Sequence, residues 1–202
     1  MKIVCLGDSL TFGYEVPRKD NWVSLAGAAG EDEFINRGVN GDSTGGMLAR
    51  FHPEVLELAP AAVIIMGGCN DIMTSGTDKG ARANLAALAH QAAGRAILPI
   101  VAAPPPFDVA HVREDWVRLT DFHRALHCLV AYVDWLRMFA SVFNITLIDF
   151  YRLFLPEPSR GLDPDLYIDG LHPSPQGHKL MAAEVLRVLA ARAPDANHNS
   201  QL

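Results

Sequence analysis

The sequence predicts an α/β protein, a three-layer αβα sandwich with a five-stranded parallel sheet. The first indication is a set of five short apolar runs. They are continuous rather than alternating, which is typical of strands buried on both faces. The second indication is that segments with helical periodicity separate these runs, as expected of a parallel sheet covered by helices on both sides. The 202 residues suffice for one domain with a sizeable core.

Most of the expected elements end at residues that disfavour their continuation. Gly7 follows the first strand, and a run of three prolines from Pro104 follows the fourth. Pro53 is expected to break or kink one helix. Ser174 is expected to cap the last helix, with Pro175 at its first position. Strands are expected over residues 2–6, 34–39, 61–66, 96–102 and 145–149, and helices over 22–29, 43–58, 79–93, 112–143 (in two pieces) and 175–192.

The order of these elements predicts a single domain over residues 1–193. The polar residues 194–202 that follow are expected to form a flexible C-terminal tail. No internal repeat or low-complexity linker divides the chain.

The composition of the chain indicates where in the cell the protein is expected to be and which classes of partner are not expected. Seventeen basic residues against 23 acidic ones give a net charge of −6, which argues against a nucleic-acid partner. Cys5, Cys69 and Cys128 are far apart and form no CxxC pair, so we expect reduced thiols and a cytoplasmic protein. The apolar run near Met1 is too short for a signal peptide. The longest uncharged stretches fall short of the roughly 18 residues that cross a membrane, so no membrane partner is expected.

Chemically active side chains follow the expected strands. In parallel sheets the ligand site lies beyond the carboxyl ends of the strands. A serine hydroxyl there, Ser9, needs an adjacent base to act as a nucleophile, and His172 is the candidate. Asp169 lies three residues before His172, so one turn places its carboxylate against the imidazole. The sequence thus predicts a Ser-His-Asp triad.

The same loops supply hydrogen-bond donors for an oxyanion. The backbone N–H groups of Ser9 and Gly41 and the side-chain amide of Asn70 together form a three-donor hole. The loss of one such donor typically removes about 2.7–4 kcal/mol of transition-state stabilisation. These residues predict acyl transfer.

Four sequence blocks resemble the GDSL, or SGNH, hydrolases, a family of lipolytic serine esterases. They are GDSLT at residues 7–11, GVNG at 38–41, GCND at 68–71 and DGLHP at 169–173. The resemblance implies a flavodoxin-like sheet, Ser9 as nucleophile, and Asp169 with His172 as acid and base. It also implies an oxyanion hole formed by Ser9, Gly41 and Asn70, with neither cofactor nor metal. Cys69 departs from the threonine that the family often has, at a position that is not catalytic.

We therefore expect a hydrolase that cleaves carboxylic esters, with short acyl groups, through an acyl-enzyme on Ser9. The alternatives within enzymes are an acyl-CoA thioesterase or lysophospholipase, and a carbohydrate O-acetyl esterase. Outside enzymes, they are a catalytically silent ligand-binding module and a flavodoxin-like redox or phosphate-binding protein. The partner in the leading interpretation is a small acyl ester or thioester. The sequence does not predict the oligomeric state.

Several residues carry competing interpretations. Asp149 and Asp165 are rivals of Asp169 for the triad acid. His123 and His127 lie four residues apart on an expected helix, but no third metal ligand is evident, which favours a surface pair. An aromatic stripe is expected to pack in the core, with a pocket wall or a dimer surface as the alternative. It comprises Trp116, Phe122, Tyr132, Trp135, Met138 and Phe139.

Overall fold

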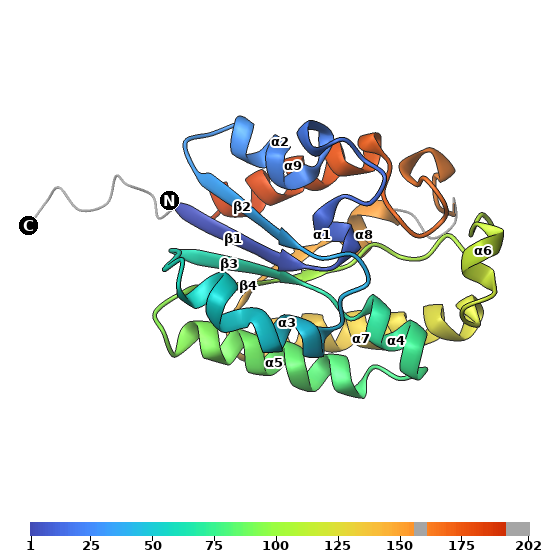
Figure 1. The fold of residues 1–202 in the computed structure, drawn as a ribbon, viewed down its shortest axis with the longest axis horizontal. Helices are drawn as coiled ribbons and strands as arrows, with labels where there is room; N and C mark the ends of the chain where they lie inside the picture. The colour runs from blue at the N-terminus through green and yellow to red at the C-terminus, as the bar shows by residue number, and fades with distance from the viewer. Residues whose placement is uncertain (156–160, 193–202) are drawn as a thin grey trace, which may run out of the picture.

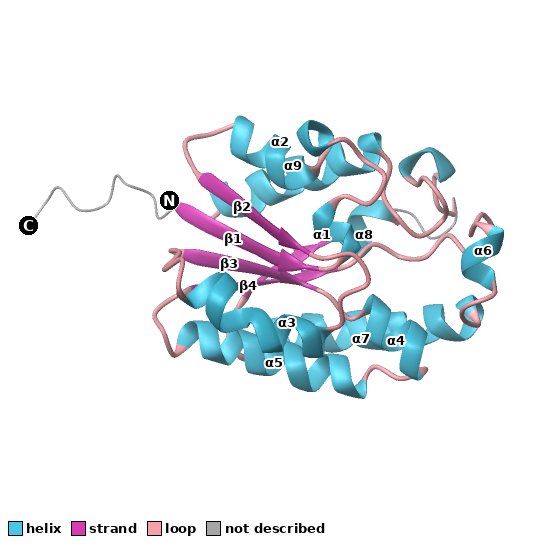
Figure 2. Cartoon of the chain, viewed as in Figure 1, coloured by secondary structure: helices cyan, strands magenta, loops and turns pink. Residues whose placement is uncertain are grey.

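In a computed structural model, residues 1–155 and 161–192 are described, and they form one five-stranded sheet between two layers of helices (Figures 1 and 2). Every pair of neighbouring strands is parallel, and their order is β2-β1-β3-β4-β5. The predicted fold class is confirmed, and each expected strand is present within two residues of its expected start. The strands are β1 (Lys2–Gly7), β2 (Glu33–Gly38), β3 (Ala62–Met66), β4 (Leu98–Ala103) and β5 (Thr146–Asp149).

The helices cover both faces of the sheet. Helices α2 and α9 pack together on one face, and α3, α5 and α7 lie on the other (Figure 1). The expected tail over residues 194–202 lies outside the described residues, as does residue 193. The helices are α1 (Ser9–Phe12), α2 (Trp22–Ala28), α3 (Thr44–Phe51), α4 (Cys69–Ser75), α5 (Lys79–Ala93), α6 (Glu114–Val117), α7 (Phe122–Val142), α8 (Phe150–Phe154) and α9 (Pro175–Ala190).

The predicted helix boundaries hold where the sequence carries clear end signals. Ser174 caps α9 by accepting a hydrogen bond from the Gly177 N–H. The expected helix over 43–58 is divided into α3 and a π-helical turn (His52–Leu56) that contains Pro53. The sequence does not predict α1, α4 or α8, because segments of four to seven residues are too short for helical periodicity to register.

Helix α7 is the longest helix in the described part of the chain. By length and composition it could cross a membrane, with a mean hydropathy of 1.2 over its most apolar window. However, Leu129, Tyr132 and Leu136 are fully buried on one side of it, where α7 packs against β4 and β5. Core packing therefore accounts for much of its apolar character.

The carboxyl ends of the five strands meet at one edge of the sheet, on the right in Figure 1. Helix α1 begins just after β1, and α4 begins just after β3. A strap over residues 108–121, which includes α6, lies beyond this edge (Figure 1). The candidate site lies between these segments.

Candidate active site

Ser9 is the first residue of α1, directly after the buried end of β1. Asp8 caps this helix, because its Oδ1 accepts a hydrogen bond from the Leu10 N–H at 2.9 Å. The helix ends after one turn at Gly13, whose φ of +86° favours glycine. Ser9 is only 9% exposed, yet it lines the pocket described below.

A buried polar network fixes the carbonyl end of α1. The side-chain amides of Asn21 and Asn36 both donate to the Thr11 carbonyl, at 3.0 and 2.8 Å. The Trp22 indole N–H donates to the Leu10 carbonyl at 3.0 Å. Helix-terminal carbonyls have no partner inside the helix, so these three donors satisfy groups that would otherwise be buried without one. The network therefore holds the turn that carries Ser9.

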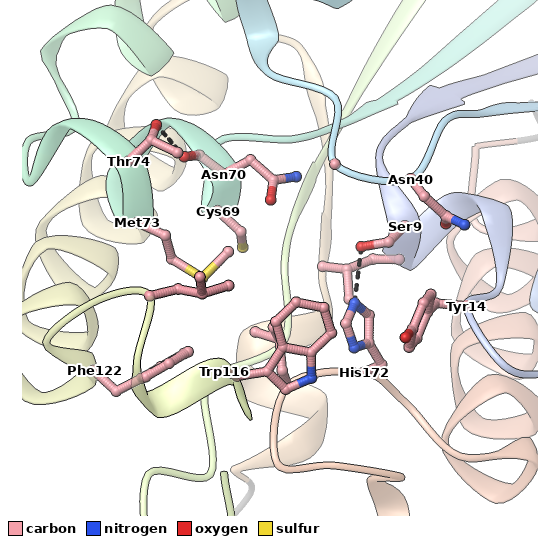
Figure 3. Close-up of a pocket in the computed structure, with 14 residues that line it drawn as sticks. Ser9, Tyr14, Asn40, Cys69, Asn70, Met73, Thr74, Trp116, Phe122 and His172 are labelled. Atoms are coloured by element: carbon pink, nitrogen blue, oxygen red, sulfur yellow. Dashed lines mark hydrogen bonds between the residues drawn. The ribbon is translucent and has the colours of Figure 1, made fainter. Parts of the chain in front are cut away.

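Ser9, His172 and Asp169 form one line of hydrogen bonds. Ser9 Oγ lies 3.0 Å from His172 Nε2 (Figure 3), and His172 Nδ1 lies 2.9 Å from Asp169 Oδ2. Asp169 Oδ1 also accepts from the Leu171 and His172 N–H groups. The neutral tautomer that fits these contacts donates from Nδ1 and accepts the Ser9 proton at Nε2.

The environment keeps Asp169 ionised. Burial alone would raise the pKa of this carboxyl, since its side chain is fully buried. The hydrogen bond and charge of His172, with the two backbone donors, outweigh burial and hold the pKa of Asp169 well below its usual range. A carboxylate in this state orients the imidazole and stabilises its protonated form.

The rival carboxylates lie elsewhere. Asp149 caps α8 and accepts from Arg137 Nε at 2.9 Å. Asp165 is exposed, and its carbonyl accepts from Ser174 Oγ. Neither side chain forms a hydrogen bond to His172 among the described contacts, so the geometry favours Asp169 as the partner of His172.

The three expected oxyanion donors, Ser9, Gly41 and Asn70, line one pocket, and Figure 3 shows Ser9 and Asn70 in it. Gly41 has a φ of +75°, and within residues 1–155 and 161–192 no atom lies within 4 Å of the position that a Cβ would take, so its backbone borders open space. Asn70 Nδ2 donates one hydrogen to the Asp42 carbonyl at 2.9 Å, which fixes the amide and leaves its second hydrogen available. The loop around Asn70 is tied by Asp71, which accepts from the backbone and hydroxyl of Thr44.

The pocket has a volume of about 180 Å³ and a largely apolar wall. Trp116, Leu119 and Phe122 contribute to this wall together with Met73 of α4. Trp116, Phe122 and Met73 can be seen around the pocket in Figure 3. The Tyr14 ring packs on the imidazole of His172, with centroids 4.3 Å apart.

The aromatic stripe of the sequence is therefore divided among three environments: the core, the pocket and solvent. Tyr132 and Phe139 are buried in the core, as expected, but Trp116 lies at the pocket and Met138 is 57% exposed. The expectation of core packing is wrong for these two residues. Nothing in the sequence around Trp116 signals its contact with Asp169, because the strap carries no recognisable motif.

Most of the remaining candidates lie apart from this site, but Cys69 lines the pocket (Figure 3). His123 and His127 are both exposed on α7. Within residues 1–155 and 161–192, no group of three or more His, Cys, Asp or Glu side chains is arranged to hold a metal ion. Cys5, Cys69 and Cys128 are free thiols.

Comparison with known proteins gives a consistent result. The chain is 28% identical to an arylesterase of Vibrio mimicus over 198 residues, which span 93% of this chain and 88% of that protein. The crystal structure of a member of the lipolytic G-D-S-L family from Veillonella parvula superposes with a TM-score of 0.79, at 25% identity, over 94% and 98% of the two chains. The lipase/acylhydrolase of Enterococcus faecalis superposes with a TM-score of 0.74, at 28% identity, over 95% and 96%.

The fold and these similarities define the chain as a carboxylic ester hydrolase. More specifically, residues 5–180 match the GDSL-like lipase/acylhydrolase family, and the chain belongs to that family.

Proposed function

We propose that this protein is a serine esterase that cleaves short-chain carboxylic esters through an acyl-enzyme on Ser9. One observation carries the proposal: the hydrogen-bonded line from Ser9 through His172 to Asp169 opens into the pocket that also contains Gly41 and Asn70. A nucleophile, a base, an orienting carboxylate and oxyanion donors are the groups that acyl transfer requires.

In the acylation step, His172 Nε2 takes the proton of Ser9 Oγ while the oxygen attacks the ester carbonyl carbon. The carbonyl oxygen becomes an oxyanion, which accepts hydrogen bonds from the Ser9 and Gly41 N–H groups and the Asn70 amide. When the bond to the leaving oxygen breaks, His172 Nε2–H protonates that oxygen. An alcohol departs, and the acyl group stays on Ser9.

In the deacylation step, water replaces the alcohol. His172 Nε2 takes a proton from this water as its oxygen attacks the acyl carbon. The proton then passes to Ser9 Oγ when the carboxylic acid leaves. Asp169 remains ionised throughout and stabilises the imidazolium that forms in each step.

The size and the lining of the pocket favour a substrate with a small acyl or aromatic group. Its volume of about 180 Å³ compares with the roughly 150 Å³ of an apolar cavity that binds benzene. The aromatic and aliphatic wall fits an apolar group of that size. The name of the Vibrio mimicus relative, an arylesterase, points to the same class of ester.

The test compares nitrophenyl acetate, butyrate and octanoate as substrates of the wild type and of Ser9→Ala. We expect the wild type to hydrolyse acetate and butyrate faster than octanoate. Ser9→Ala should lose at least about 10³-fold in kcat, because the nucleophile is absent. Thr74→Ala is a matched control, since Thr74 also lines the pocket but its hydroxyl bonds only backbone carbonyls.

The pattern of activity also separates the alternatives. A faster reaction with octanoate would favour a lysophospholipase-like enzyme, and a preference for thioesters would favour a thioesterase. Activity only on acetylated sugars would indicate a carbohydrate O-acetyl esterase. If Ser9→Ala kept wild-type rates, Ser9 would not be the nucleophile and the proposal would be overturned.

A further inference from the structure

We propose that Trp116 is a positioning residue for the triad carboxylate, and that the strap it belongs to completes the active site. The inference rests on the proposed role of Asp169. It adds a residue outside the four sequence blocks, and it joins the wall of the substrate pocket to the acid of the triad.

The central contact is short and buried at one end. Trp116 Nε1–H donates to Asp169 Oδ2 at 2.7 Å, and the Asp169 side chain has no exposed surface. This is the same oxygen that accepts from His172 Nδ1. The other oxygen, Oδ1, accepts from the backbone N–H groups of Leu171 and His172. The donors from Leu171 and His172 lie within three residues of Asp169, whereas Trp116 donates to the carboxylate from a distant part of the chain.

The strap is attached to the same segment through its backbone. The Arg113 N–H donates to the Asp169 carbonyl at 3.0 Å, and the Asp108 N–H donates to the Gly170 carbonyl at 2.8 Å. Gly170 has a φ of +76°, and a Cβ there would lie 2.6 Å from the Val112 nitrogen. The two backbones therefore pass in close contact, and this holds the indole N–H at the carboxylate.

The rest of the indole faces the pocket. Trp116 lines the pocket together with Leu119 and Phe122, and its ring centroid lies 5.8 Å from that of His172 (Figure 3). The guanidinium of Arg113 lies over the indole ring, 5.4 Å from its centroid. One ring thus contacts the triad through its N–H and meets the substrate group through its carbon atoms.

The physical effect of the N–H is on orientation and charge. A buried carboxylate needs a donor for each accessible lone pair, and four donors fix the plane of Asp169. Without the indole N–H, the plane of the carboxylate is less firmly fixed, and the charge on Oδ2 is less dispersed while this oxygen still accepts from His172. The pKa of Asp169, already held low by His172 and the backbone donors, keeps the group ionised in either case. The loss should therefore appear in catalysis rather than in the ionisation of the acid.

The experiment compares Trp116→Phe with the control Arg118→Ala on nitrophenyl butyrate. Trp116→Phe retains an aromatic wall but lacks the N–H, so kcat should fall about tenfold with KM changed less than twofold. The low-pH limb of kcat/KM should move to higher pH, because the charge of Asp169 then acts more fully on the imidazolium. Arg118→Ala removes only an exposed ion pair with Glu114 on the same strap, so it should leave kcat, KM and the pH profile unchanged.

Trp116→His supplies an N–H at a similar place and should recover part of kcat, a rescue that a purely structural role would not give. The inference is overturned if Trp116→Phe keeps the wild-type kcat and pH profile, or if only its KM changes. It is also overturned if kcat falls without a shift of the pH profile and Trp116→His gives no recovery. Ser9→Ala separates this failure from that of the proposed function: an inactive Ser9→Ala beside a normal Trp116→Phe removes only the role of Trp116.

Discussion

Ser9, the proposed nucleophile, and Asp169, the proposed triad acid, are held in different ways. Around Ser9, donors from α2 and β2 satisfy the carbonyls of α1 in a buried network centred on Asn21. Around Asp169, the indole N–H of Trp116 donates from the strap. The strap residues from Val109 onward are half-buried or exposed. The first arrangement belongs to the core of the fold, and the second is attached to its edge.

This difference suggests a division of roles. Substitutions in the buried network should lower the stability of the whole domain, because the network lies beside α2, which packs on α9 and on the sheet. Residues of the strap contact the site and the pocket but few core elements, so changes there should alter catalysis with little effect on folding. The strap is thus the part of the site most open to variation in substrate preference.

The largest effect expected on the nucleophile side is a pair of opposite pH dependences. Burial raises the pKa of Asp8 to about 7, and burial lowers the pKa of His178 to about 4. Between pH 4 and 7 folded Asp8 retains a proton that the unfolded chain releases, so stability falls as pH rises, by roughly 4 kcal/mol. His178, whose Nδ1 accepts from the Trp22 N–H, remains neutral while the unfolded chain takes up a proton, so stability falls as pH falls, by roughly 3 kcal/mol.

Urea unfolding at several pH values measures these two slopes. Asp8→Asn should make the free energy of unfolding rise from pH 4 to 7, because the His178 effect is then unopposed. His178→Asn should make it fall over the same range, and the double variant should be the flattest of the three. Equal slopes in both single variants would show that neither group titrates as its burial implies.

A smaller loss is expected from Asn21→Ala. Asn21 is 1% exposed, donates to the Thr11 carbonyl and caps α2 by accepting from the Val23 N–H. Removing both contacts should lower the free energy of unfolding by about 2–3 kcal/mol. Arg118→Ala is the control on the strap, where the ion pair with Glu114 is exposed and contributes at most about 0.5 kcal/mol. Similar losses in the two variants would contradict the division between the regions.

The sequence predicts the residues that follow the parallel strands, and the His172–Asp169 pair, far better than it predicts the strap. Ser9, Gly41 and Asn70 follow parallel strands, so the topology alone brings them to one edge, and the His172 to Asp169 spacing is short enough for a local turn to close. Trp116 carries no such constraint. Its position depends on the path of the strap between the prolines and α7, which is set by tertiary contacts to Asp169 and Gly170.

The network around Asn21 shows a second kind of contact that the sequence does not predict. Asn21 and Asn36 are common turn and strand-edge residues, and no local pattern distinguishes a cap from a donor to a distant carbonyl. Their partner, the Thr11 carbonyl, belongs to a one-turn helix that periodicity cannot reveal. Side chains that act through backbone groups of short elements thus become visible only when the elements are placed in space.

A smaller loss of stability than that of Asn21→Ala, and the sharpest test of the strap, is expected from Gly170→Ala. The φ of +76° makes alanine unfavourable there by roughly 1–2 kcal/mol, and the new Cβ would lie 2.6 Å from the Val112 nitrogen. The strap must then move away, which takes the Trp116 N–H from Asp169. We expect kcat on nitrophenyl butyrate to fall about tenfold while the protein remains folded.

Gly161→Ala is the matched control for this variant. Gly161 also has a positive φ, of +70°, but no atom of the described residues lies within 4 Å of the position of its Cβ. The two variants therefore share the backbone strain, and only Gly170→Ala displaces the strap. If both lower kcat equally, strain and not strap position explains the loss. If only Gly170→Ala lowers kcat, the contact between the strap and the Asp169 segment is what catalysis requires, and the exposed edge of the site is as necessary to it as the buried network.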